Sequence, residues 1–210
     1  MLIAGLTVLV LGASHLAKPT YLIKTLHDEL TDRGAVVHSL GVCGVMPSAW
    51  LGATPSRCGG AERIEAEPMV LSLASAAQTK PLQALLQASK PDLVIIVMGD
   101  NLANYKASDF SRSDVKKELL SLTTVLAKNE IRCAWVGPAW GEENKLSGKT
   151  FKRVQDLSTY LETQVKPCAY VNSLEMTKPG EWKTTDGQHY FAEGYQSWGA
   201  TIAAEIEQLP

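Results

Sequence analysis

Short blocks rich in Val, Ile and Leu recur along the chain and alternate with amphipathic stretches. The first block, residues 6–11, reads LTVLVL and carries no charge, which is typical of a strand buried on both faces of a sheet. Four later blocks have the same character and predict four further strands, the last of them short. These blocks span residues 35–40, 93–98, 131–136 and 169–171.

The stretches between these blocks predict helices. Within residues 19–33, Leu22, Leu26 and Leu30 fall four positions apart and share one helical face, and Gly34 ends the helix. Because strands and helices alternate, the order predicts a single α/β domain over residues 1–210. The expected fold is a doubly wound five-stranded parallel sheet with helices on both faces, as in flavodoxin-like proteins. The other predicted helices span residues 80–89, 112–129, 151–165 and 192–208.

The region from residue 42 to about residue 69 is rich in Gly and Pro and is long for a loop without structure. It therefore predicts a lid or binding loop. None of the four cysteines has the Cys-x-x-Cys or Cys/His spacing of a zinc site, so no metal is expected. The spacings suit two disulfides, Cys43–Cys58 and Cys133–Cys168, which would place the protein in the periplasm or outside the cell. The alternative is four reduced cysteines in a cytoplasmic protein.

Composition and charge narrow the possible partners. The chain has 20 basic and 22 acidic side chains and a net charge of −2, so nothing in its electrostatics favours nucleic acid. The longest apolar run near the start, residues 2–11, is about half the length that spans a bilayer, and no integral membrane segment is expected. This run also lacks the features of a signal peptide, so export requires a signal removed before this sequence. The oligomeric state is not predicted.

Side chains suited to nucleophilic acyl transfer occur in the loops after the predicted strands, where such sheets form their binding crevice. This chemistry needs a hydroxyl, a base, a carboxylate that orients the base, and donors for the developing oxyanion. Ser14 follows the first strand, and the small residues before it permit a sharp turn that exposes its hydroxyl. Asp186 and His189 lie three positions apart and supply the carboxylate and the base. The Ser14 and Gly44 backbone N–H groups and the Asn101 amide are candidate oxyanion donors.

Four sequence blocks contain these residues, in the same order as in a known family. The first is GASH at residues 12–15, the third is GDNL at residues 99–102 and the fourth is DGQH at residues 186–189. The second contains Gly44, with Gly41 as a competing choice. Together the blocks resemble the SGNH hydrolases, also called GDSL esterases, in which they supply Ser, Gly, Asn and His.

The resemblance implies the SGNH hydrolase fold and a serine-dependent ester hydrolase or acyl transferase that needs no cofactor. Ser14 would be the nucleophile, His189 the base and Asp186 the residue that orients it. Ser14, Gly44 and Asn101 would form the oxyanion hole. The reaction would pass through an acyl-serine intermediate.

Two positions depart from the family pattern. Ala13 and Leu102 stand where the family commonly has aspartates. In this respect the chain is similar to a divergent branch of O-acetylesterases and O-acetyltransferases that modify polysaccharides, which implies a small-molecule or polysaccharide ester as substrate. The alternative is a non-catalytic glycan-binding or scaffold module of an exported polysaccharide pathway. A nucleotide-binding α/β protein fits less well, because no Gly-x-Gly-x-x-Gly loop follows the first strand.

Four other residues are candidates for substrate binding. His15, next to Ser14, lines the pocket or faces solvent, and Asp100, next to Asn101, is a helper group or caps its loop. Trp140 follows the fourth predicted strand and Trp182 precedes the loop with Asp186 and His189, and both could offer a flat apolar face to a sugar ring. Structural roles are expected for the two remaining histidines, His27 and His38.

Overall fold

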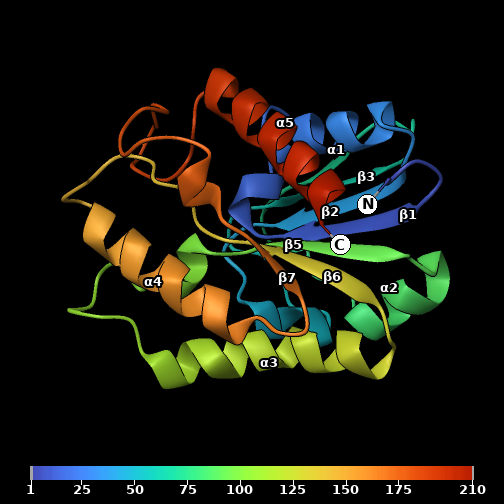
Figure 1. Cartoon of the computed structure of the whole chain (residues 1–210), viewed down its shortest axis with the longest axis horizontal. Helices are drawn as coiled ribbons and strands as arrows, with labels where there is room; N and C mark the ends of the chain where they lie inside the picture. The colour runs from blue at the N-terminus through green and yellow to red at the C-terminus, as the bar shows by residue number, and fades with distance from the viewer. Residues whose placement is uncertain (1, 210) are drawn as a thin grey trace.

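The computed structural model describes residues 2–209, and a seven-stranded sheet runs through its centre (Figure 1). The strands follow the order β4-β3-β2-β1-β5-β6-β7. From β2 to β7 along this order all neighbours are parallel, which confirms the predicted five-stranded parallel sheet. Its strands are β1 (Thr7–Gly12), β2 (Val36–Val42), β5 (Leu93–Val97), β6 (Arg132–Val136) and β7 (Ala169–Val171).

Five helices cover the two faces of the sheet, as predicted. α1 and α5 pack together on one face, whereas α2, α3 and α4 cover the other (Figure 1). Among residues 2–209, no helix is both long enough and apolar enough to cross a membrane. The helices are α1 (Leu22–Asp32), α2 (Leu82–Ser89), α3 (Arg112–Lys128), α4 (Phe151–Gln164) and α5 (Ala192–Gln208).

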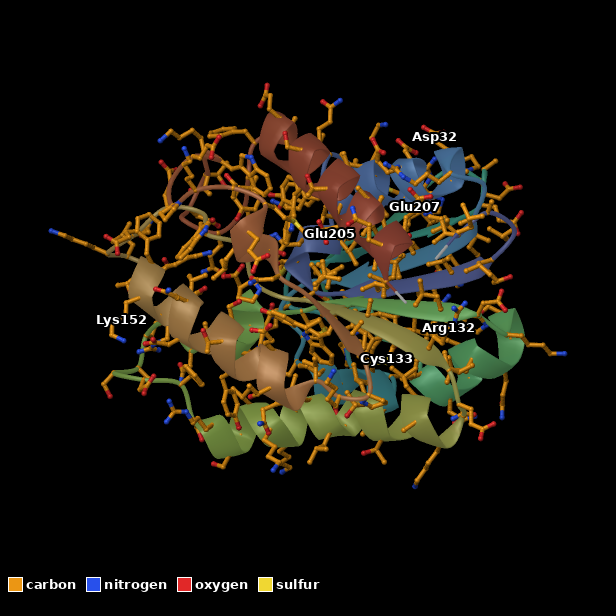
Figure 2. All side chains as sticks on the ribbon, viewed as in Figure 1. Asp32, Arg132, Cys133, Lys152, Glu205 and Glu207 are labelled. Atoms are coloured by element: carbon orange, nitrogen blue, oxygen red, sulfur yellow. A yellow bond between two sulfur atoms is a disulfide. The ribbon has the colours of Figure 1, made fainter. Side chains whose placement is uncertain are left out.

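The alternating side chains of β1 divide the interior into two cores. Val8 and Val10 face α1 and α5, while Leu9 and Leu11 face the helices on the other side. At the edge of the first core, Arg33 donates to Glu207 of α5, with 3.2 Å between Nε and Oε2. Figure 2 labels Asp32 at the end of α1 and Glu207 on α5. The uncharged first block is thus explained by burial on both faces.

Two strands were not predicted. β3 (Gly60–Ile64) pairs antiparallel with β2, and β4 (Val70–Ser72) pairs antiparallel with β3. β3 lies inside the region expected to be an irregular loop, because its sequence GAERI lacks an apolar pattern. Its charged side chains make ion pairs instead: Arg63 binds Asp28 of α1, and Glu62 binds Lys80 at 2.6 Å. An antiparallel extension of the sheet therefore replaces the last part of the expected loop.

Both predicted disulfides are formed. Cys43–Cys58 connects the chain just after β2 to the residues before β3. Cys133–Cys168 connects β6, where Figure 2 labels Cys133, to the residue before β7. No cysteine is left free.

Short 3-10 turns follow three neighbouring parallel strands at their carboxyl ends. η1 (Ser14–Leu16) follows β1, η2 (Pro47–Leu51) lies beyond β2, and η4 (Asp100–Leu102) follows β5. Since β2, β1 and β5 are adjacent, these turns meet at one edge of the sheet. The two remaining turns are η3 (Ala74–Ala76) and η5 (Ser173–Glu175).

Gly41 should tolerate no side chain, because β2 lies against the backbone of η1 there. A Cβ atom at Gly41 would lie 2.2 Å from the Leu16 carbonyl oxygen, whereas a Cβ at Gly52 would have no atom within 4 Å. We expect Gly41→Ala to lower the free energy of unfolding by about 2–3 kcal/mol. The control Gly52→Ala should change it by less than about 0.5 kcal/mol. Urea denaturation measures both, and equal stabilities would contradict the close approach.

His27 should make stability depend on pH. Its ring is fully buried and bonds to Ser39 Oγ at 2.8 Å and to the Glu65 carbonyl oxygen at 3.0 Å. Burial lowers the pKa of His27 to about 4. An unfolded histidine has a pKa of about 6.5, so the unfolded state takes up the proton first and stability falls as pH drops from about 6.5 towards 4. Urea titrations across this range should show a shallower fall for His27→Gln, and an unchanged slope would contradict this expectation.

Candidate active site

Ser14 is the first residue of η1, directly after β1. The turn is tight because Gly12 has no side chain: a Cβ there would lie 2.7 Å from the Val97 carbonyl oxygen of β5. Ser14 itself is half-buried, and the residues on either side of it are buried. The predicted sharp turn thus leaves the Ser14 hydroxyl accessible.

Ser14, His189 and Asp186 form an unbroken chain of hydrogen bonds. His189 Nδ1 lies 2.7 Å from Asp186 Oδ2, and His189 Nε2 lies 2.8 Å from Ser14 Oγ. Because a carboxylate only accepts, Nδ1 carries the proton and Nε2 is free to accept the Ser14 hydroxyl proton. About a fifth of the His189 side chain, 22%, is exposed. The arrangement is the one in which a histidine activates a serine hydroxyl.

Asp186 is fixed by its own turn. Its Oδ1 accepts the backbone N–H groups of Gln188 and His189, at 2.9 and 2.8 Å. Burial raises the pKa of Asp186, but the hydrogen bonds from His189 and Gln188 outweigh this effect and hold the pKa below its usual value. The carboxylate is therefore ionised at neutral pH and keeps the imidazole in one tautomer.

A neighbouring segment supports this turn from the side. Glu142 Oε2 accepts the Thr184 backbone N–H at 2.9 Å, and the Glu142 N–H donates to the Gly187 carbonyl oxygen at 3.1 Å. A Cβ at Gly141 would lie only 2.2 Å from that same oxygen. The segment after β6 thus packs directly against the turn that carries His189.

Tyr21 supports the His189 ring, a role that the sequence analysis missed. The two rings stack with 5.8 Å between centroids and 21° between planes. Tyr21 also stacks on Tyr195 of α5, with 4.1 Å between ring centroids. Tyr21 is the residue before α1 and belongs to no motif, so only the fold brings it to His189.

The candidate oxyanion donors follow the three neighbouring strands β2, β1 and β5. Asn101 Nδ2 donates to the Val45 carbonyl oxygen at 3.0 Å, which ties η4 to the loop after β2 and leaves a second amide hydrogen. Within residues 2–209 no acceptor contacts the Gly44 N–H. The Ser14 N–H begins η1, where a helix leaves its first N–H groups without an internal partner. Three donors are thus available at this edge of the sheet.

The competing glycine has a different position. Gly41 is buried inside β2 and pairs with Gly12 of β1. Gly44 lies beyond the strand, is exposed and has a φ of +78°, a conformation that favours glycine. Of the two, Gly44 is the one whose N–H is accessible.

Two of the four substrate-binding candidates lie inside the protein. His15 is 4% exposed and Asp100 is 7% exposed, and they contact each other, with 3.0 Å between His15 Nε2 and Asp100 Oδ2. The solvent-facing alternative for His15 is therefore wrong. The Asp100 carboxylate accepts hydrogen bonds from the side chains of His15 and Lys149. Buried side chains of this kind act on a substrate only through their neighbours.

The two tryptophan candidates are both half-buried. Trp140 donates its indole N–H to the Leu174 carbonyl oxygen at 3.0 Å and packs edge-on against Phe151. Trp182 and the exposed Phe191 line a surface groove of about 440 Å³, and they precede and follow the turn of residues 186–189 in the sequence. Trp182 therefore keeps an accessible face, whereas Trp140 is engaged in packing.

Asn101 is one of the residues that line a second groove, of about 310 Å³. Amide, hydroxyl and carboxylate groups of Asn101, Asn104, Ser111 and Asp114 line it together with apolar Met46. Among residues 2–209, no group of three or more His, Cys, Asp or Glu side chains is placed to hold a metal ion. The chemical groups that the site offers are a hydroxyl, an imidazole and a carboxylate.

Comparisons with solved structures identify the fold. An aryl esterase from M. smegmatis is 14% identical with a TM-score of 0.63, and the match covers 98% of this chain and 100% of that one. A GDSL-like lipase from Bacteroides thetaiotaomicron is 16% identical with a TM-score of 0.60, covering 96% and 88%. An acetylxylan esterase from Geobacillus stearothermophilus is 13% identical with a TM-score of 0.59, covering 98% and 96%. The predicted resemblance to SGNH hydrolases is confirmed at the level of the fold.

Sequence comparison places the chain more narrowly. No family model matches it. Over 210 residues it is 34% identical to Protein BcsX from Komagataeibacter xylinus, and the match covers 99% of this chain and 79% of that protein. The chain therefore belongs to the family of Protein BcsX and has the fold of the SGNH hydrolases.

Proposed function

We propose that the protein is a serine-dependent ester hydrolase or acyl transferase that acts on an O-acylated carbohydrate. The observation that carries this proposal is the hydrogen-bonded chain from Asp186 through His189 to Ser14. In such a chain the histidine accepts the serine proton while the carboxylate stabilises the imidazolium that forms.

In the first half of the reaction, Ser14 Oγ attacks the ester carbonyl carbon and its proton moves to His189 Nε2. The negative charge develops on the former carbonyl oxygen, which accepts hydrogen bonds from the Ser14 and Gly44 N–H groups and the Asn101 amide. The intermediate collapses when the bond to the leaving alcohol breaks and His189 returns the proton to that alcohol. An acyl group remains on Ser14.

In the second half, a hydroxyl compound attacks the acyl group and His189 again takes its proton. If water attacks, an acid leaves and the protein is an esterase. If a sugar hydroxyl attacks, a new ester forms and the protein is a transferase. Both routes regenerate Ser14, and the choice depends on which acceptor the site admits and how well it excludes water.

Two observations support a carbohydrate substrate. The groove that Asn101 helps to line has amide, hydroxyl and carboxylate groups on its walls, which suit the hydroxyl groups of an uncharged sugar. Trp182 offers an apolar face beside the other groove. One of the proteins with this fold is an acetylxylan esterase, and we propose acetyl as the acyl group here.

We also propose that the protein works in the periplasm or outside the cell. Both pairs of cysteines form disulfides. Such bonds persist in oxidising compartments and are rare in the cytosol.

The departures at Ala13 and Leu102 are the support for a non-catalytic glycan-binding module. Both side chains are buried, at 1% and 2% exposure, and pack in the core under α2, α3 and α4. The hydrogen bonds between Ser14, His189 and Asp186 form without carboxylates at these positions. We therefore favour catalysis, and the binding module is the outcome if the next experiment finds no turnover.

Ser14→Ala should abolish turnover of p-nitrophenyl acetate. We expect kcat to fall by at least about 10³-fold, because the nucleophile is lost while the oxyanion donors remain. Intact-mass spectrometry should find an acetyl adduct on the wild type and none on Ser14→Ala. With an oligosaccharide added, acetyl on the sugar indicates a transferase and acetate alone an esterase.

The matched control is Ser113→Ala, which removes an exposed hydroxyl in the first turn of α3 and should react like the wild type. If wild type and Ser14→Ala release nitrophenol equally and neither carries an adduct, the proposed nucleophile is wrong. Binding of the oligosaccharide without turnover would then support the glycan-binding module.

The two disulfides should differ in their effect on catalysis. A Cβ at Gly44 would lie 3.6 Å from Cys58 Sγ, so the Cys43–Cys58 bridge holds a proposed oxyanion donor in place. Replacing both of these cysteines by Ala should lower kcat by roughly 10-fold. The matched variant, Ala at Cys133 and Cys168, should lower the free energy of unfolding by about 3–4 kcal/mol and leave kcat unchanged. Equal kcat values for the two variants would contradict the role of the first bridge.

A further inference from the structure

A buried ion pair lies among the residues that neighbour the proposed active site. Lys149 Nζ is 2.9 Å from Asp100 Oδ1, and the two side chains are 0% and 4% exposed. Lys149 also donates to the Ala139 carbonyl oxygen at 3.3 Å. The free energy lost when two charged groups leave water can exceed the attraction between them. Stability alone therefore does not account for this buried pair.

Asp100 is the centre of the cluster. Besides Lys149, it accepts a hydrogen bond from the Tyr105 hydroxyl and one from His15 Nε2, the latter at 3.0 Å. Burial alone raises the pKa of Asp100, but the charge of Lys149 and the bonds from His15 and Tyr105 hold it well below its usual value. The carboxylate is therefore ionised and is bound by three donor groups of this chain.

His15 extends the cluster towards His189. Burial lowers the pKa of His15, so its ring is neutral: Nε2 donates to Asp100 and Nδ1 accepts the Tyr195 hydroxyl at 2.9 Å. Tyr195 stacks on Tyr21, and Tyr21 stacks on His189. A continuous line of contacts thus runs from the carboxylate to the proposed base.

The segments joined at Asp100 are the ones that carry the proposed site. His15 is the neighbour of Ser14 in η1, and Asp100 is the neighbour of Asn101 in η4. Lys149 fixes the carbonyl group of Ala139 at the start of the segment that packs against the turn with His189. The Asp100 carboxylate is therefore connected to the segments that carry the proposed nucleophile and the oxyanion amide. Through Lys149 it is also connected to the segment that packs against the turn with His189.

We propose that Asp100, paired with Lys149, is a positioning residue that holds Ser14, Asn101 and His189 in their reactive arrangement. The proposal rests on the proposed function of Ser14. It also explains how the chain manages without carboxylates at Ala13 and Leu102. The inward-facing carboxylate at residue 100 joins η1 and η4 by a direct contact between their side chains.

The test is the double variant Asp100→Asn/Lys149→Met, which removes both charges together and leaves neither one buried alone. We expect kcat for p-nitrophenyl acetate to fall roughly 10–100-fold, while KM stays within about twofold. Here kcat is calculated from the concentration of protein whose Ser14 reacts with a fluorophosphonate. Tyr195→Phe keeps the ring stacking but removes the hydroxyl bonded to His15, and it should lower kcat in the same direction. This second variant preserves the test if the double variant does not fold.

The matched control is Glu62→Gln/Lys80→Met. Glu62 also binds one lysine and one histidine, with Lys80 Nζ at 2.6 Å and His38 Nε2 at 2.8 Å, but it lies on β3 and is partly exposed. Removing this pair changes the same chemical groups outside the proposed site. It should leave kcat and KM unchanged.

A spectroscopic measurement separates positioning from mere stability and does not depend on turnover. Proton NMR of the wild type should show the Nδ1 proton of His189 in its hydrogen bond with Asp186. In the folded double variant this resonance should shift or broaden. An unchanged resonance overturns the positioning role whatever the kinetics, and a changed resonance with the wild-type kcat overturns its effect on catalysis. If the wild type itself neither turns over ester nor reacts at Ser14, the proposed function fails and the resonance still decides the positioning role.

Discussion

The site depends on close backbone contact at the carboxyl ends of β1, β2 and β5. A side chain at Gly12 would meet the Val97 carbonyl oxygen at 2.7 Å, and one at Gly41 would meet Leu16 at 2.2 Å. The turn η1 therefore packs closely on β2 through Leu16, which limits how far Ser14 at its start can move. A parallel sheet supplies this constraint because its strands end together at one edge. The turn at residues 186–189 lies at the same edge, where His189 contacts Ser14.

Two chains of polar contacts meet at this edge of the sheet. We call the more exposed one the upper chain and the buried one the lower chain. The upper chain, from Asp186 through His189 to Ser14, is partly exposed, as groups that meet a substrate must be. The lower chain, from Lys149 through Asp100 and His15, is buried, and such networks are rigid when every member has its partners. The rigid layer supports the accessible one, and the aromatic stack on His189 connects them.

The parts of the fold and site that the sequence predicts are those with a local signal. The parallel strands were found from uninterrupted apolar blocks, and Ser14, Asp186 and His189 from short spacings in the loops. β3 was missed because its stability comes from pairing with β2 and from ion pairs, which leave no apolar pattern in GAERI. Lys149 and Tyr21 were missed for a related reason: each is a single residue whose contact lies far along the chain, 49 positions away for Lys149 and Asp100.

The placement of Asp100 also bears on the electrostatics of the proposed reaction. The transition state gathers negative charge next to the Asn101 amide, and an unpaired carboxylate on the adjacent residue would oppose it. Here the charge of Asp100 is balanced by Lys149 at 2.9 Å, so the pair is nearly neutral when seen from the site. Ala13 and Leu102 add no charge of their own. A buried, compensated carboxylate thus orders the loops while leaving the oxyanion donors unopposed, which a free carboxylate next to the nucleophile would not do.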